Sequence, residues 1–247
     1  MHESKTLSKR KIPTPEDSNS APEGILPIYK PRGPTAFQLV RLLRKHLGVR
    51  KIGHAGTLDP FAEGVMVLLV GRKYTRLSDA LVNTEKEYIG RVVLGIETDT
   101  YDVDGKILHR SDLIPSLEEV THVLNKFQGK VQQIPPMFSA KKKDGKKLYE
   151  LARKGKTIER DPVTVELQTE LLEYHYPYLD IRVTCSKGTY IRALAHDIGT
   201  LLTCGGHLTS LTRTRSGKYS IADCFDGSKL QSPDLDVEEL CGRLLSQ

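Results

Sequence analysis

Apolar residues recur at helical spacing in several segments of the chain. The clearest pattern starts at Ser116, where the order Ser-Leu-Glu-Glu is a capping box, and Gly129 ends it. A second helix is predicted between the N-cap residue Thr35 and Gly48. The expected apolar face of the first helix is Val120, Val123, Leu124 and Phe127, and that of the second is Phe37, Val40, Leu43 and Leu47.

Further helices and strands follow from the same patterns. Helices are expected at Tyr74–Val82, Tyr190–Leu202 and Leu235–Leu245. Alternation and β-branched residues predict strands at Ile25–Tyr29, Val65–Val70, Tyr88–Ile96, Val163–Leu172, Tyr178–Cys185 and His207–Arg215.

The order of these elements indicates the fold class. The segments Val163–Leu172 and Tyr178–Cys185 are expected to pair as an antiparallel hairpin, with Leu179, Ile181 and Val183 on one face. No regular strand–helix–strand period is present. We therefore predict an α+β fold with a central mixed or antiparallel sheet, flanked by helices and loops.

Composition and charge narrow the classes of function. The 247 residues carry a net charge of +6, which suits a polyanion such as RNA. The four cysteines are widely spaced and have no histidines at ligand spacing, so we expect reduced thiols, no metal and no organic cofactor. The apolar runs are too short to cross a membrane, and the first 23 residues lack the apolar core of a secretory signal. We expect a cytoplasmic protein.

A glycine-rich loop carries the strongest candidate for chemistry. Asp59 lies in it beside Pro60, and Gly53, Gly56 and Gly64 surround it. On spacing alone, an aspartate before a proline favours a turn or cap over catalysis by roughly two to one. The sequence has no phosphate-binding Gly-Lys-Ser/Thr loop, dinucleotide fingerprint, His-Glu-x-x-His pair or nucleophile elbow, which disfavours the corresponding hydrolases and dehydrogenases.

The wider sequence around Asp59 resembles a known family. The segment Lys51-Ile-Gly-His-Ala-Gly-Thr-Leu-Asp-Pro-Phe-Ala-Glu-Gly64 is similar to the catalytic loop of the TruB-type tRNA pseudouridine synthases. Other motifs of that family occur in the same order between about Gly24 and Asp226: Tyr29-Lys-Pro-Arg-Gly-Pro-Thr35, Lys86-Glu-Tyr88, Thr98-Asp-Thr-Tyr-Asp-Val-Asp-Gly105, Gln133-Ile-Pro-Pro-Met-Phe-Ser-Ala-Lys141, Asp144-Gly-Lys-Lys-Leu-Tyr149 and Cys185-Ser-Lys-Gly-Thr-Tyr-Ile-Arg192.

The resemblance implies the pseudouridine synthase fold and an isomerase that converts uridine to pseudouridine, with uridine 55 in the T loop of tRNA as the expected target. It implies that Asp59 is the catalytic aspartate, that Arg192 pairs with it and that Asp102 orients Arg192. The remaining implied residues are Tyr88 stacking on the target base, Tyr190 and Leu211 in the base pocket, His54 filling the space that the extruded base leaves, and Lys30 and Lys187 as supports.

These residue types suit the chemistry. A carboxylate can attack C1′, add to the base or remove a 2′ proton, and the sequence leaves these three roles open. In each role it acts as an anion, which a neighbouring arginine favours. Tyrosine, with an ordinary pKa of ~10, stays neutral and offers a flat ring in a pocket.

Each residue also has a plainer interpretation. Tyr88 on an alternating strand could be a core aromatic, Arg192 a surface ion pair worth ~0–1 kcal/mol, and His54 an ordinary loop residue. Lysines and arginines between Ser139 and Lys156 could be a solvated face or bind phosphates. The order of the motifs, rather than any one residue, favours the functional interpretation.

The expected organisation is a polar, basic, disordered tail over 1–23, a catalytic domain over 24–230 and a short C-terminal helix over 231–247. Bacterial relatives commonly continue into an RNA-binding PUA domain, for which 231–247 is too short. We therefore expect tRNA binding that is weaker or more sensitive to salt than in relatives with that domain.

Two alternatives to the tRNA enzyme remain open on the sequence. One is a non-catalytic RNA-binding or RNA-folding protein, which would have no need of the set Asp59, Tyr88, Tyr190 and Arg192. The other is the same isomerase acting on a different RNA, such as ribosomal RNA. We expect the T arm of tRNA as the partner, no obligate protein partner and a monomer.

Overall fold

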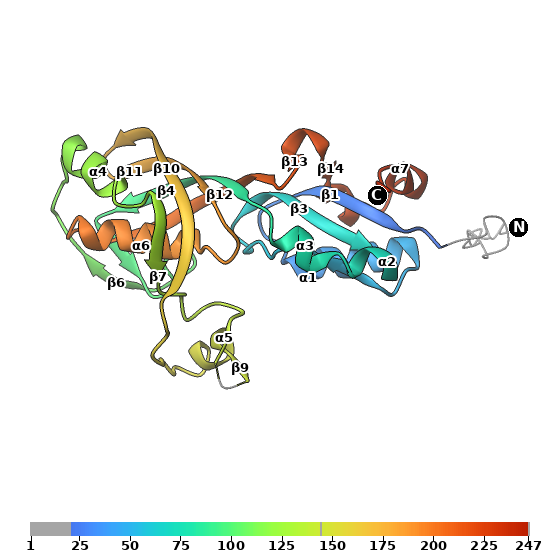
Figure 1. Cartoon of the computed structure of the whole chain (residues 1–247), viewed down its shortest axis with the longest axis horizontal. Coiled ribbons are helices and arrows are strands. Elements are labelled where there is room, and N and C mark those ends of the chain that lie inside the picture. Colours follow the sequence, from blue (N-terminus) through green and yellow to red (C-terminus); the bar gives the residue numbers. More distant parts are fainter. Residues whose placement is uncertain (1–20, 144, 247) are drawn as a thin grey trace, which may run out of the picture.

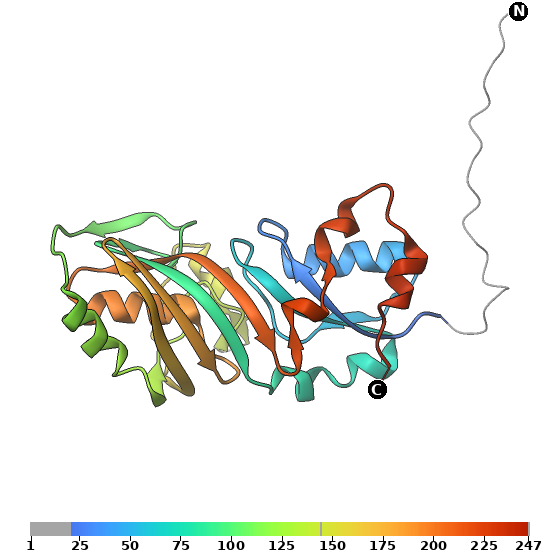
Figure 2. The ribbon, with the colours of Figure 1, turned by 90° about the horizontal axis from the view of Figure 1, so that it is seen from above.

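The computed structural model describes residues 21–143 and 145–246, so most of the predicted tail and Asp144 lie outside the described residues. Within that part of the chain, a sheet of ten strands runs the length of the molecule (Figures 1 and 2). Its order is β14-β1-β3-β12-β4-β11-β10-β7, with β2 added to β3 and β13 to β12. The strands are β1 (Gly24–Lys30), β2 (Ile52–His54), β3 (Glu63–Val70), β4 (Lys86–Leu94), β7 (Gly129–Gln133), β10 (Val163–His175), β11 (Tyr178–Cys185), β12 (Gly206–Ser216), β13 (Tyr219–Ser220) and β14 (Phe225–Asp226).

Helices and two short hairpins complete the chain. The α-helices are α1 (Ala36–Leu47), α2 (Arg72–Thr75), α3 (Ser78–Val82), α4 (Leu117–Leu124), α5 (Leu148–Ala152), α6 (Ile191–Leu201) and α7 (Val237–Gly242). The 3₁₀ helices are η1 (Ile221–Asp223) and η2 (Gly227–Gln231), and the hairpins pair β5 (Ile96–Thr98) with β6 (Ile107–Arg110) and β8 (Lys142–Lys143) with β9 (Lys146–Lys147).

The molecule has two lobes that share the sheet (Figure 1). We call residues 24–82 and 217–246 the small lobe and residues 86–216 the large lobe. Strand β12 connects them: it pairs antiparallel with β4 in the large lobe and parallel with β3 in the small lobe, where Arg213 lies opposite Gly64. Because β1 and β14 are also parallel, the sheet is mixed, and the predicted α+β class is confirmed.

Each face of the sheet is covered by a different part of the chain. In the large lobe, α4 and α6 bury Val120, Leu194 and Ile198 against the hairpin β10–β11. In the small lobe, α1 and α7 bury Leu43 and Leu240 in one cluster, and α2 packs in another. The loops that carry the site lie where these cores meet.

The helix starts were predicted correctly. Thr35 caps α1 through Gln38, and Ser116 caps α4 through Glu119, each as a complete capping box. Gly48 ends α1 in the left-handed conformation, with φ of 66°. The hairpin β10–β11 also forms as expected.

Phe37 was wrongly assigned to the buried face of α1. Its side chain is 65% exposed, and Ala36 and Leu39 take the place expected for it beside Val40 and Leu43. The buried face is therefore centred about one helical position away from the predicted one.

Two further helices are shorter than predicted. The expected helix Tyr74–Val82 is divided into α2 and α3, because Leu77 N donates to Tyr74 O in a tighter three-residue turn. The helix expected at Leu235–Leu245 ends at Gly242, since Leu245 pairs with Ile25 of β1 by hydrogen bonds of 2.9 and 2.8 Å. The C-terminal segment thus continues the packing of the small lobe.

Candidate active site

Asp59 lies on the loop that joins β2 to β3, and a buried lysine holds this loop in place. The Lys30 Nζ donates to Pro60 O at 3.3 Å and to Ala62 O at 2.6 Å, one and three residues after Asp59. The side chain of Lys30 is fully buried, and this burial lowers its pKa to about 8, although the Asp59 carboxylate acts in the opposite direction. Lys30 thus supports the loop, in the position expected for it.

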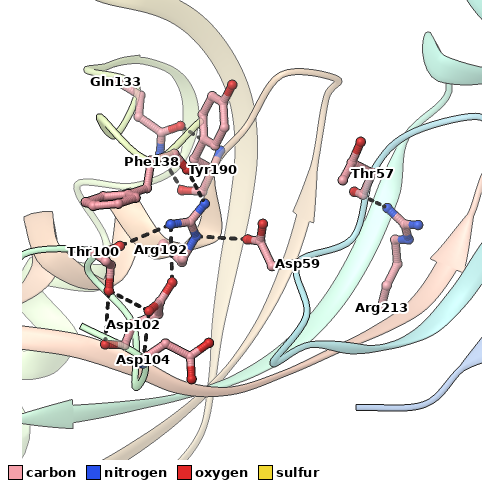
Figure 3. Close-up of polar contacts among 10 residues, drawn as sticks. All are labelled: Thr57, Asp59, Thr100, Asp102, Asp104, Gln133, Phe138, Tyr190, Arg192 and Arg213. Carbon is pink, nitrogen blue, oxygen red and sulfur yellow. Dashed lines mark hydrogen bonds and ion pairs between the residues drawn. The ribbon is translucent and has the colours of Figure 1, made fainter. Parts of the chain in front are cut away.

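The Asp59 carboxylate contacts the guanidinium of Arg192 (Figure 3). Asp59 Oδ2 lies 2.9 Å from Arg192 Nε, and the Asp59 side chain is 36% exposed whereas that of Arg192 is only 6% exposed. Asp59 comes from the small lobe and Arg192 from the first turn of α6 in the large lobe. The site therefore forms where the lobes meet, with the carboxylate as its open side.

Asp102 lies on the other side of Arg192, as expected. Its Oδ2 is 3.2 Å from Arg192 Nη1, while its Oδ1 accepts hydrogen bonds from Thr100 Oγ1 and the Asp104 backbone N–H (Figure 3). Burial raises the pKa of Asp102, and the Thr100 hydroxyl and the Arg192 charge oppose this shift. The guanidinium is thus held by a carboxylate that is itself fixed by its own turn.

Backbone oxygens fix the rest of the Arg192 side chain. Nη1 donates to Thr100 O at 3.1 Å, and Nη2 donates to Phe138 O at 2.9 Å. The arginine consequently uses all three of its nitrogens, and only Nε is directed at Asp59. This geometry gives Asp59 one preferred position.

Tyr190 forms the N-cap of α6 and is held by Gln133, which the sequence did not single out. The Tyr190 N–H donates to Gln133 Oε1 at 2.8 Å, and Gln133 Nε2 donates to Tyr190 O at 3.0 Å. Burial raises the pKa of the Tyr190 hydroxyl. The buried amide of Gln133 thereby fixes the start of α6 and, two residues on, Arg192.

Tyr88 and Leu211 form the apolar side of the site. Tyr88 lies on β4 and Leu211 on β12, and both are buried in one cluster with Leu58 from the Asp59 loop. Burial raises the pKa of Tyr88, so its hydroxyl stays protonated at neutral pH. The structure therefore brings Tyr88 and Leu211 next to the Asp59 loop.

Arg213 is a residue of the site that the sequence analysis missed. Its side chain is 1% exposed, and it donates to Val65 O at 2.5 Å, Gly56 O at 3.3 Å and Thr57 O at 3.4 Å. The guanidinium also lies 6.0 Å from the centre of the Tyr88 ring. Residues two apart on a strand face the same side of the sheet, so Arg213 lies on the same buried side of β12 as Leu211. This alternation could have identified Arg213 from the sequence.

His54 and Lys187 lie outside the Asp59–Arg192–Asp102 network. His54 is half-buried at the end of β2, where burial and the Arg213 charge lower its pKa. Lys187 is exposed in the loop before α6 and lines, with Lys141 and Tyr190, a cavity of about 300 Å³. The surroundings of His54 and Lys187 do not indicate a role for either residue.

The basic segment after Ser139 protrudes from the large lobe as β8, β9 and α5 (Figure 1). Within residues 21–143 and 145–246, no group of three or more histidine, cysteine or acidic side chains is placed to bind a metal ion. In the same residues, no helix is long and apolar enough to span a membrane. The cysteines are free thiols.

Comparison with known families gives two matches along the chain. Residues 44–191 match the model of the TruB family pseudouridylate synthases, N-terminal domain. Residues 192–243 match that of the tRNA pseudouridylate synthase B C-terminal domain, rather than a PUA domain. The boundary between them falls inside the segment that the sequence analysis assigned to one catalytic domain.

Curated relatives match over most of this chain. A tRNA pseudouridine synthase B of Protochlamydia amoebophila is 57% identical over 227 residues, which are 92% of this chain and 86% of the relative. The protein of the same name from Chlamydia pneumoniae is 58% identical over 87% of this chain and 92% of its own. That from Clostridium novyi is 45% identical, over 86% and 74%.

Solved structures share the fold. The crystal structure of a Cbf5–Nop10–Gar1 complex contains a chain with a TM-score of 0.64 and 30% identity, over 82% of this chain and 52% of that one. An H/ACA ribonucleoprotein bound to a substrate RNA containing 2′-deoxyuridine gives 0.62 and 27%, over 83% and 51%. The chain thus spans about half the length of these solved proteins.

Proposed function

Because the chain belongs to the TruB family of pseudouridylate synthases and is an isomerase with tRNA pseudouridine synthase B activity, we propose that it converts uridine 55 in the T loop of tRNA, with Asp59 as the catalytic carboxylate. The observation that carries the proposal is the Asp59–Arg192 contact of 2.9 Å on the open side of an otherwise buried network.

The reaction moves one bond within a nucleotide. The bond from ribose C1′ to uracil N1 breaks, the freed base turns, and C1′ bonds to C5; C5 then loses its proton and N1 gains one. Asp59 would act as nucleophile or base in this exchange, and the fixed charge of Arg192 favours its anionic form. No atom is exchanged with a co-substrate except protons, so we propose no cofactor.

Tyr88 and Leu211 would receive the flipped uracil. Their buried side chains offer an apolar wall and an aromatic face beside Leu58, one residue before Asp59. Flipping a base costs a few kcal/mol of stacking and pairing. We propose that His54, at the end of β2, offsets part of that cost by filling the space left in the RNA, and that Tyr190 lines the uracil pocket. Lys187 would support the RNA from the neighbouring cavity that it lines with Tyr190, whose lining includes none of Asp59, Tyr88 and Leu211.

The T arm would be bound by the basic parts of a single chain. Lys142, Lys143, Lys146 and Lys147 lie on the protruding β8–β9 hairpin, which suits contacts to phosphates. We propose that the enzyme acts as a monomer in the cytoplasm and without an obligate protein partner.

The test uses unmodified tRNA transcript that carries tritium at uridine C5. The enzyme should release tritium into water, because C5 loses its hydrogen during the exchange. A tRNA with cytidine at position 55 and a ribosomal RNA hairpin are the substrate controls. Tritium release from the ribosomal hairpin alone would show that ribosomal RNA, and not tRNA, is the substrate. RNA binding without tritium release would show a non-catalytic RNA-binding protein.

Asp59→Asn tests the catalytic residue. The variant should lose release by a factor of at least about 10³ while keeping its RNA affinity, because a carboxylate contributes little to binding an anion. Asp112→Asn, at an exposed position of the large lobe, is the matched control and should turn over as the wild type does. Measurable turnover by Asp59→Asn would assign the chemistry to another group.

A further inference from the structure

The exposed face of α1 has a composition that its role in packing does not explain. Phe37 is 65% exposed, whereas Phe61, Phe127 and Phe225 are buried. A single exposed apolar side chain is common on protein surfaces, so the exposure of Phe37 is informative only together with the charged residues beside it. The helix does not need it, because its other face already fills the core.

Phe37 begins a row of exposed residues along the helix. Arg41 and Lys45 follow it at intervals of four, which places all three on one side of α1. Among the ion pairs of the described residues, Arg41 and Lys45 take part in none. We call Phe37, Arg41 and Lys45 the α1 ridge.

Neighbouring elements leave this ridge open. The sheet covers the side of Leu43, and the C-terminal segment covers the flank of His46, whose ring contacts Leu230 O of η2 at 2.9 Å. Figure 2 shows this segment beside α1. The ridge lies on the remaining side.

The ridge begins close to the catalytic loop. The turn before α1 is tied to that loop by the hydrogen bond from Gly33 N to Pro60 O, 2.8 Å. Near the other end, Arg44 Nη2 donates to Ile52 O at 2.8 Å, after which β2 returns towards His54. His54 thus lies two residues beyond Ile52, where α1 contacts β2.

The composition of the ridge fits RNA. Unpaired bases stack on aromatic rings whatever their identity, and arginine or lysine nearby binds the adjoining phosphates. From Phe37 to Lys45 the helix rises about 12 Å, which spans more than one nucleotide. The positive charges of Arg41 and Lys45 favour a negatively charged partner over an apolar one.

We propose that the α1 ridge is a second RNA-binding site: Phe37 stacks on an unpaired base of the substrate outside the pocket, and Arg41 and Lys45 bind the phosphates that follow. The proposal deepens the proposed function, on which it rests. Stacking and charge make separable contributions, and both can be measured.

The first experiment measures the affinity of a T-arm hairpin at several salt concentrations. Phe37→Ala should weaken binding on the order of tenfold with an unchanged salt slope, since stacking releases no counterions. Arg41→Gln should reduce the slope by about 0.7–0.9, and Lys126→Gln, exposed at the end of α4, should not change it. Wild-type affinity for Phe37→Ala, or a wild-type slope for Arg41→Gln, would overturn the proposal.

The second experiment detects stacking directly. The sequence contains no tryptophan, so Phe37→Trp introduces a single indole. The RNA should quench its fluorescence and bind as tightly as to the wild type, whereas the indole of Tyr178→Trp, at an exposed position on β11, should not be quenched. An unquenched indole at position 37 in the saturated complex would also overturn the proposal.

These outcomes are independent of the catalytic assignment. Both experiments measure binding alone, and they are run in parallel in the wild type and in the Asp59→Asn background. If the wild type releases tritium and Phe37→Ala binds RNA as the wild type does, the α1 ridge is not an RNA-binding site and the proposed function stands. If RNA binding depends on Phe37 but no RNA releases tritium, the α1 ridge is an RNA-binding site and the proposed function fails.

Discussion

Arg213→Met removes the side chain that connects the Asp59 loop to Tyr88, part of the proposed base pocket. The guanidinium binds the carbonyls of Gly56 and Thr57 in the loop and of Val65 in β3, and it lies over the ring of Tyr88. Methionine reproduces the aliphatic stem of arginine but not its guanidinium, and it has no donor. The variant therefore keeps the packing of the stem and loses the charge and the hydrogen bonds.

The structure allows the effect on stability to be separated from the effect on rate. A hydrogen bond from a charged donor contributes about 1.5–3 kcal/mol, and the two long bonds to Gly56 and Thr57 lie at the low end. Burying a guanidinium without a carboxylate partner costs several kcal/mol, which the substitution relieves. These effects nearly cancel, so we expect the free energy of unfolding to change by no more than about 2 kcal/mol.

The rate is more sensitive than the stability. Asp59 follows Gly56 by three residues and Thr57 by two, so the loop that carries Asp59 loses the hydrogen bonds that hold it against β12. A displacement of about 1 Å at a reacting group can lower the rate about 100-fold, or about 2.7 kcal/mol of activation free energy. We expect Arg213→Met to lower the single-turnover rate by that factor with little change in RNA affinity.

Single-turnover tritium release and urea unfolding measure the two quantities. Arg215→Gln is the control, since Arg215 lies two residues along the same strand and pairs with Glu85 near the surface; both rate and stability should stay near the wild type. A rate within threefold of the wild type in a folded Arg213→Met enzyme would refute the argument that Arg213 positions Asp59.

Two further predictions concern pH. Because burial raises the pKa of Asp102, acidification should break its ionic contact with Arg192 at a higher pH than for an ordinary aspartate, and the rate should fall there. Asp102→Asn should turn over more slowly, and its pH–rate profile should lack this fall on the acid side. An unchanged fall in the variant would contradict the role of Asp102. Lys30 has a pKa of about 8 in the folded chain and 10.5 ordinarily, so the unfolded chain binds more protons between these values and the stability due to Lys30 should rise with pH there, by at most about 3 kcal/mol. The difference in urea-unfolding free energy between wild type and Lys30→Met should change by about 2 kcal/mol from pH 8 to 10, and a constant difference would exclude the effect.

Local features of the fold were predictable from the sequence. The capping boxes at Thr35 and Ser116 define helix starts because their partners lie three residues away. The hairpin β10–β11 was predictable for the same reason, since its strands are neighbours in the chain. The family motifs added the contacts among Asp59, Arg192 and Asp102, which no local pattern indicates.

Contacts between distant segments were not predictable. The position of β12 between β3 and β4 depends on pairings across more than a hundred residues, and it is this position that buries Arg213 beneath the catalytic loop. The exposure of Phe37 likewise depends on which side of α1 the sheet and the C-terminal segment cover. Helical periodicity alone fits either a face with Phe37 or one with Leu39.

The crossing of β3 and β12 at Gly64 makes activity a measure of how completely the chain has folded. A side chain at position 64 would lie 2.3 Å from the Arg213 carbonyl oxygen, so the strands can meet only with glycine there. Asp59 and Arg192 come from different lobes, and either lobe folded alone supplies one charge of the pair. On warming, the enzyme should therefore lose activity when its less stable lobe unfolds, while the other lobe is still folded.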